Sequence, residues 1–178
     1  MKACFDVHYD DHGAAAAALV FDQWQDAEPV DQYSVRLSEI GEYEPGKFYL
    51  RELKPLAAVI EKISQPIDTF IIDAYCYLDG DQAPGLGFYL YESLRKRFSE
   101  VPELKVIGVA KNPFRGSDHA QPVLRGDSTR PLWITSIGVD PVDAAAQIRS
   151  MDGEFRMPTL LRKVDQDCRA ALIDPAPQ

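Results

Sequence analysis

Three carboxylates and one lysine stand at or near the ends of separate apolar runs. Asp6 follows Ala3-Cys-Phe, Asp73 follows Phe70-Ile-Ile, Lys111 follows a run from Val106 to Ala110, and Glu52 follows Phe48-Tyr-Leu-Arg. A charged residue at a strand end projects from the edge of a sheet. Residues this far apart in sequence can converge only if the segments that carry them are neighbours, so the pattern predicts a shared site at one edge of a sheet.

The chemistry of the set indicates a metal site. Hard cations such as Mg²⁺ take oxygen ligands and keep several waters, so a few carboxylates suffice to hold one. Each acid taken alone is better explained by a helix N-cap or a solvated strand end, and it is the set of four residues that favours a functional site. His8 shares a strand face with Asp6. We interpret His8 as a residue that fills space beside the sheet, with a metal-adjacent role as the alternative.

The order of periodic segments predicts an α/β fold. Residues 2–10 alternate as a strand, and 14–24 with 32–40 complete an antiparallel meander. The later predicted strands are 69–77, 104–110 and 131–137, the predicted helices are 51–63, 85–98, 140–151 and 159–173, and 112–130 is predicted to be a loop. Glu52 is then expected at a helix N-terminus, and Pro55 in the first helical turn. A meander followed by alternating helices and strands predicts a mixed sheet, antiparallel and then parallel, flanked by helices.

Length and cysteine usage predict one domain over residues 1–178 in a reducing cytoplasm. The three cysteines are odd in number, widely spaced and form no Cys-x-x-Cys, so the sequence suggests neither a disulfide framework nor a zinc knuckle. No run approaches 18 apolar residues, and the apolar run 14–20 lacks a preceding basic segment. We therefore expect neither secretion nor a membrane partner.

Charge is distributed unevenly along the chain. The formal net charge of -9 argues against unaided electrostatic attachment to nucleic acid. Residues 91–130, however, hold eight basic and five acidic side chains, which makes this segment +3 and the remainder -12. A charged surface helix explains Arg95 to Arg97. Arg115, Arg125 and Arg130 fall around the predicted loop, and we predict that they contact a phosphate backbone.

Several short motifs resemble, in order, the landmarks of the endonuclease V family. They are Asp6-Val-His-Tyr9, Tyr43-Glu-Pro-Gly46, Arg51-Glu52, Ile71-Ile-Asp73, Gly85-Leu-Gly87, Ile107-Gly-Val-Ala-Lys111, Arg130-Pro-Leu-Trp-Ile-Thr135 and Val164-Asp-Gln-Asp-Cys-Arg169. The likeness covers nearly the whole chain, which resembles a short and divergent member. It implies a ribonuclease H-like fold and Mg²⁺-dependent cleavage of a nucleic-acid strand near a deaminated base, typically inosine.

The resemblance also implies roles for individual residues. Asp6, Glu52 and Asp73 are similar to the family's metal-binding carboxylates, and Lys111 to its active-site lysine. Asp165 falls where the family has a His or Asp in its last helix, near the metal. A cation held in this way, Mg²⁺ or Mn²⁺ in its place, polarises a phosphoryl oxygen and lowers the pKa of a bound water, while the lysine neutralises phosphate charge.

Recognition of the base is where the chain departs from the family. Tyr43, with Pro45 and Gly46, resembles the loop whose tyrosine fills the gap left by a displaced base, but Glu42 and Glu44 flank it. The segment 74–77 replaces a Gly-His-Gly stretch, and 136–139 replaces a Pro-Gly-His.

Two classes of function follow from these observations. The first is a Mg²⁺-dependent endonuclease that acts on DNA or RNA near a deaminated base or distorted site, in DNA repair or nucleic-acid processing, without an obligatory protein partner. The alternative is a catalytically weak nucleic-acid-binding relative that acts as a damage sensor or regulatory module. Nuclease activity on another structured substrate lies between the two.

Overall fold

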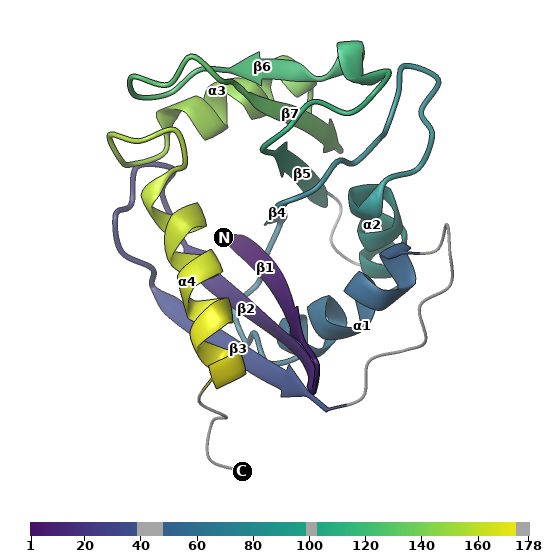
Figure 1. Ribbon diagram of the computed structural model, residues 1–178, viewed down its shortest axis with the longest axis vertical. Helices are drawn as coiled ribbons and strands as arrows, with labels where there is room; N and C mark the ends of the chain where they lie inside the picture. Colours follow the sequence, from purple (N-terminus) through teal and green to yellow (C-terminus); the bar gives the residue numbers. More distant parts are fainter. Residues whose placement is uncertain (39–47, 99–102, 174–178) are drawn as a thin grey trace.

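A single seven-stranded mixed sheet runs through the computed structural model, which describes residues 1–38, 48–98 and 103–173 (Figure 1). The strand order is β3-β2-β1-β4-β5-β7-β6. The strands are β1 (Lys2–Asp10), β2 (Gly13–Phe21), β3 (Asp31–Leu37), β4 (Thr69–Ile72), β5 (Lys105–Ala110), β6 (Gln121–Val123) and β7 (Leu132–Ile137). β1, β2 and β3 form the predicted antiparallel meander, while β1, β4 and β5 are parallel neighbours. The predicted mixed sheet is confirmed.

Helices cover both faces of this sheet. The helices α1 (Phe48–Ile60) and α2 (Leu86–Arg97) pack on one face, and α3 (Pro141–Ser150) and α4 (Thr159–Ile173) on the other (Figure 1). α3 begins as its Asp-Pro sequence predicts, because the Asp140 carboxylate accepts a hydrogen bond from the Val142 amide. No helix within the described ranges is long and apolar enough to span a membrane.

The alanine-rich strand β2 lies between these two layers. All nine of its residues are buried, and five consecutive alanines occupy positions 14–18. Ala15 and Ala17 face the layer of α3 and α4, whereas Ala16 and Ala18 face α1. A methyl group is the smallest side chain that still buries apolar surface, so both layers can approach this strand closely.

Helix α1 begins earlier than its periodicity predicts. It starts at Phe48, which places Glu52 in its second turn and Pro55 in its interior. The expectations of a helix N-terminus for Glu52 and a first turn for Pro55 are therefore wrong. Proline lacks the N–H that would bond the Arg51 carbonyl, and tertiary packing of the following residues, Leu56 and Val59, offsets the lost bond.

The segment after Asp73 leaves the sheet, although residues 69–77 were predicted as one strand. β4 ends at Ile72, and the chain then crosses over β5 at Gly108. A Cβ on Gly108 would lie 2.3 Å from the Ala74 carbonyl oxygen, so only glycine permits this crossing. The Cys76 amide donates to the Thr135 hydroxyl at 2.8 Å. Apolar composition alone does not distinguish such a buried crossing from a strand.

The predicted loop 112–130 contains regular structure as well. A 3-10 turn spans Ser117–His119, and β6 follows it as an edge strand paired with β7. Pro122 is compatible with that position because an edge strand leaves one row of backbone groups without a partner strand.

Candidate active site

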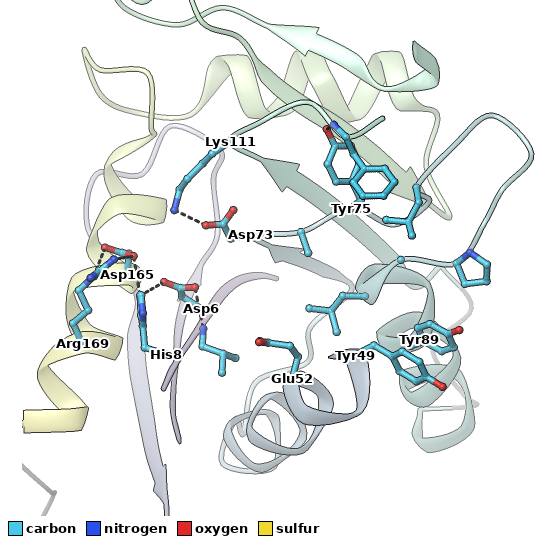
Figure 2. Close-up of a pocket in the computed structure, with 17 residues that line it drawn as sticks. Asp6, His8, Tyr49, Glu52, Asp73, Tyr75, Tyr89, Lys111, Asp165 and Arg169 are labelled. Carbon is cyan, nitrogen blue, oxygen red and sulfur yellow. Dashed lines mark hydrogen bonds and ion pairs between the residues drawn. The ribbon is translucent and has the colours of Figure 1, made fainter. Parts of the chain in front are cut away.

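Three of the predicted residues lie at one edge of the parallel strands. Phe5 is paired with Ile72, and Ile72 with Gly108. Asp6 therefore stands where β1 loses β4 as a partner, Asp73 immediately follows β4, and Lys111 immediately follows β5. The Lys111 ammonium lies 2.5 Å from Asp73 Oδ2 (Figure 2). Neighbouring strands thus bring these charges together, as the sequence predicts.

A cavity of about 620 Å³ opens at this edge. Asp6, His8, Asp165 and Arg169 lie together in it, and Tyr49 and Tyr89 lie apart from them (Figure 2). The charged and ionisable acids and bases that line the cavity are Asp6, His8, Glu52, Asp73, Lys111, Asp165 and Arg169, and the other lining residues are Val7, Tyr49, Ala74, Tyr75, Leu78, Pro84, Gly85, Leu86, Tyr89 and Phe114. All five residues proposed for catalysis therefore line one cavity.

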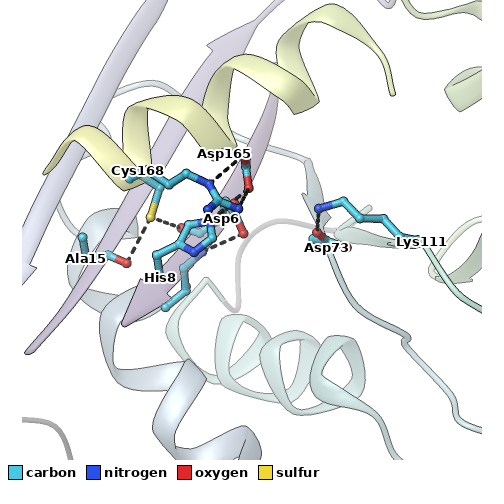
Figure 3. Close-up of polar contacts among 9 residues, drawn as sticks. Asp6, His8, Ala15, Asp73, Lys111, Asp165 and Cys168 are labelled. Carbon is cyan, nitrogen blue, oxygen red and sulfur yellow. Dashed lines mark hydrogen bonds and ion pairs between the residues drawn. The ribbon is translucent and has the colours of Figure 1, made fainter. Parts of the chain in front are cut away.

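The tightest cluster in this cavity contains a residue that the sequence left ambiguous. His8 Nε2 lies 3.0 Å from Asp165 Oδ1 and 3.2 Å from Asp6 Oδ2 (Figure 3). Possible ligand atoms of these three residues lie within 4.8 Å of one another. Arg169 donates two hydrogen bonds to Asp165, at 3.0 and 3.2 Å. These contacts favour the metal-adjacent interpretation of His8, which its two-residue spacing from Asp6 already allowed.

Burial makes two of the acids hard to ionise. Glu52 is 9% exposed, and burial raises the pKa of its carboxyl to about 7. Repulsion from Asp6 and Asp73 raises this pKa further, whereas the Tyr9 hydroxyl and the Arg51 charge lower it. Burial likewise raises the pKa of Asp6 to about 6, and Asp73 adds to this while His8 opposes it. The negative charge on these acids is thus poorly compensated by the protein itself.

Asp165 and Lys111 keep their charges more readily. Partial burial disfavours the Asp165 carboxylate, but hydrogen bonds from Arg169 and His8 outweigh it and hold its pKa well below the ordinary value. Burial disfavours the Lys111 ammonium, yet Asp73, with Asp6 and Asp165, raises its pKa above the ordinary value. Lys111 is therefore a permanent cation in the cavity.

Arg156 supports the backbone of Lys111, a role that no sequence pattern indicates. Its guanidinium donates to the Lys111 carbonyl and, at 2.8 Å, to the Pro131 carbonyl. These bonds tie the start of the loop after β5 to the start of β7. Arg156 thereby fixes where the lysine side chain begins.

The residues predicted to bind nucleic acid have different fates. Tyr43, Pro45 and Gly46 lie outside the described residues. Arg115 and Arg130 are exposed.

Arg125 is only 7% exposed, which contradicts its predicted contact with nucleic acid. Its guanidinium donates to backbone carbonyls of Arg149, Met151, Asp152, Gly153 and Phe155. These carbonyls satisfy the N–H donors of the buried guanidinium, so Arg125 stabilises the protein's own backbone and is not placed to contact a phosphate.

Comparisons with known proteins agree with this geometry. A model of the family described as Endonuclease V matches residues 2–153. Endonuclease V of Streptomyces coelicolor is 31% identical, over 96% of this chain and 78% of the relative. Endonuclease V of Nocardia farcinica is 28% identical, over 94% of this chain and 79% of the relative.

Solved structures support the same assignment. Endonuclease V of Streptomyces avermitilis superposes with a TM-score of 0.71 at 26% identity, covering 96% of this chain and 80% of that one. Endonuclease V of Ciona intestinalis was solved with a 23mer DNA containing an inosine followed by a ribo-adenosine. It superposes with a TM-score of 0.71 at 14% identity, covering 97% of this chain and 85% of that one. The predicted ribonuclease H-like fold is confirmed. The chain belongs to the endonuclease V family, and it is a nuclease, a hydrolase that acts on phosphodiester bonds.

Proposed function

We propose that this nuclease requires a divalent cation, Mg²⁺ with Mn²⁺ as a substitute, and cuts a DNA or RNA strand near a deaminated base of the inosine type. The observation that carries the proposal is that Asp6, Glu52, Asp73 and Lys111 line one cavity, where Asp6 also belongs to the group of close ligand atoms with His8 and Asp165. The inosine-containing DNA bound by the Ciona intestinalis relative supports the choice of base.

The acids of the cavity fit a hard cation. Asp6 Oδ2 is buried and has no hydrogen-bond partner among the described residues, since His8 approaches it to 3.2 Å without hydrogen-bond geometry. Glu52 is buried close enough to Asp6 and Asp73 to be repelled by both. Buried charge of this kind calls for a counterion. Asp6, Glu52 and Asp73, with Asp165, would hold the ion.

The bound cation supplies Lewis-acid polarisation of a phosphoryl oxygen and a water of lowered pKa. The protein's own groups do the rest. The Lys111 ammonium neutralises charge that develops on the phosphate, and Arg156 keeps its backbone in place. In the absence of substrate, this ammonium forms an ion pair with the Asp73 carboxylate.

Recognition of the strand is assigned to residues predicted to bind nucleic acid. In this proposal Tyr43, with Pro45 and Gly46, fills the gap left by the displaced base. Arg115 and Arg130 contact phosphates, which suits their exposure.

The test is one panel of end-labelled DNA and RNA strands that carry inosine, uracil, an abasic site, a mismatch or no lesion. We expect cleavage of the inosine strands with Mg²⁺ or Mn²⁺, and none with EDTA, because the acids then lack their ion. Tight binding of inosine strands without cleavage in any metal would instead indicate a catalytically weak binding protein. Cleavage of only the mismatched or abasic strands would contradict the choice of base.

We expect His8→Ala to destabilise the ion-free protein by about 1–2 kcal/mol, because the Asp165 carboxylate loses a hydrogen-bond donor beside a second acid. The loss should be smaller at saturating Mg²⁺, where an ion takes over the neutralising role. Urea unfolding in EDTA and in Mg²⁺ measures both values. His12→Ala, in an exposed turn, serves as the control. An equal loss in both conditions would return His8 to a purely space-filling role.

A further inference from the structure

A second cavity of about 470 Å³ adjoins the first. Its lining comes entirely from α1 and α2, and it shares Tyr49 and Tyr89 with the catalytic cavity. The other lining residues are Leu53, Glu92, Ser93, Lys96 and Arg97. The two cavities meet at these tyrosines, and we refer to the two together as the groove. One part of it holds the acids, and the other lies at the last turn of α2.

The two tyrosines form a flat aromatic surface in this groove. Their ring centroids are 3.5 Å apart and their planes differ by 7° (Figure 2). Both side chains remain partly exposed. A ring pair at van der Waals separation leaves no room for insertion between the rings, so a planar ligand would stack on an outer face. Nucleic-acid bases stack on aromatic side chains in this way, whatever their sequence.

Basic groups stand at the far end of the groove. Arg95, Lys96 and Arg97 form the last turn of α2, and all three are exposed. Arg97 pairs with Glu61 at 2.6 Å, whereas no carboxylate of the described residues pairs with Lys96. Glu92 is the acid that lines this cavity. Cations at a helix C-terminus are favoured by the helix dipole. These cations also lie beside the aromatic surface, so a nucleotide whose base stacks on the tyrosines could place its phosphate next to them.

We propose that Tyr49, Tyr89 and Lys96 form a track for the single-stranded segment that flanks the cleaved bond. A base stacks on the tyrosine pair, and Lys96 contacts a phosphate of the same segment. The track rests on the proposed function, since it guides a strand toward the acids of the first cavity. It also gives a role to part of the basic segment that a charged surface helix would otherwise explain.

Binding of labelled strands, measured in EDTA so that they stay intact, tests the track. Because a base stacks on one outer face of the pair, we expect Tyr49→Leu or Tyr89→Leu, whichever removes the ring that carries the base, to weaken binding of a long single strand about 10-fold, the effect of losing one base stack. Tyr49→Phe and Tyr89→Phe should bind like the parent, because the stacking surface remains. Lys96→Ala should lower the salt slope by about 1, the loss of one phosphate contact. Lys62 is an exposed lysine outside the groove, so Lys62→Ala should leave the salt slope unchanged.

A crosslinking experiment locates the strand directly. A 5-iodouracil placed at successive positions beside the cleaved bond should crosslink to Tyr49 or Tyr89 at one of them, as identified by mass spectrometry. Parent-like binding by both leucine variants, or crosslinks that avoid both tyrosines, overturns the track even if the protein cuts inosine strands normally. Failure of the proposed function has a different signature, since no strand in the lesion panel would then be cut.

Discussion

Replacing Asp73 with asparagine is expected to slow cleavage by about 10³-fold or more while leaving the fold intact. Loss of this charge removes a proposed cation ligand and the partner of Lys111, which lies 2.5 Å away. Metal coordination contributes several kcal/mol to stabilising a phosphoryl transition state, and each 1.36 kcal/mol corresponds to a factor of ten. Single-turnover cleavage of an inosine strand at saturating Mg²⁺ measures the effect.

The control for this variant is Asp127→Asn, which removes the same charge from an exposed loop. Its cleavage rate should match the parent. We expect the ion-free Asp73→Asn variant to be about as stable as the parent. The variant loses the ion pair with Lys111, but it also removes a charge that repels Asp6 and Glu52, and the second effect offsets the first. A cleavage rate close to the parent's would remove Asp73 from the catalytic set.

Glu52→Gln is expected to make the ion-free protein more stable at pH 8 by roughly 3 kcal/mol. Burial raises the pKa of Glu52 in the folded protein from the ordinary 4.5 to about 7. The folded state therefore binds this proton more tightly than the unfolded state. The resulting penalty is absent below pH 4.5 and complete above pH 7, so ion-free stability falls as the pH rises through this window.

Urea unfolding in EDTA between pH 4.5 and 8 measures this dependence. The parent should lose stability across the window, and Glu52→Gln should lose much less. Adding Mg²⁺ should stabilise the parent mainly at the upper end, where Glu52 is ionised, and the variant less. Parallel stability profiles for the two proteins in EDTA would show that Glu52 ionises without a penalty and is not part of a strained acid cluster.

Local sequence pattern could predict most of the fold and part of the site. Asp6, Asp73 and Lys111 were identifiable because each stands where an apolar run ends, and parallel neighbours place such ends at one edge. Strand and helix periodicity likewise located the elements that carry them. Glu52 lines the cavity with Asp6 and Asp73, but its predicted place at a helix N-terminus is wrong, because Pro55 lies inside α1 and not in its first turn.

Other features depend on contacts between distant segments. Arg125 resembled a phosphate-binding residue because no local pattern reveals that carbonyls some 24 to 30 residues later surround its guanidinium. The pairing of Tyr49 with Tyr89 depends similarly on how α1 and α2 pack. Sequence specifies these arrangements only through the whole fold.

The alanines of β2 have a consequence for how this nuclease can change. Glu52 reaches the cavity from the helix layer that covers Ala16 and Ala18, while Asp165 reaches it from the layer that covers Ala15 and Ala17. A larger side chain at Ala16 or Ala18 would press on the layer that carries Glu52, whereas one at Ala15 or Ala17 would press on the layer that carries Asp165. Substitutions at alternate positions of one buried strand would therefore act on different acids of the active site, although none of these positions lines the cavity.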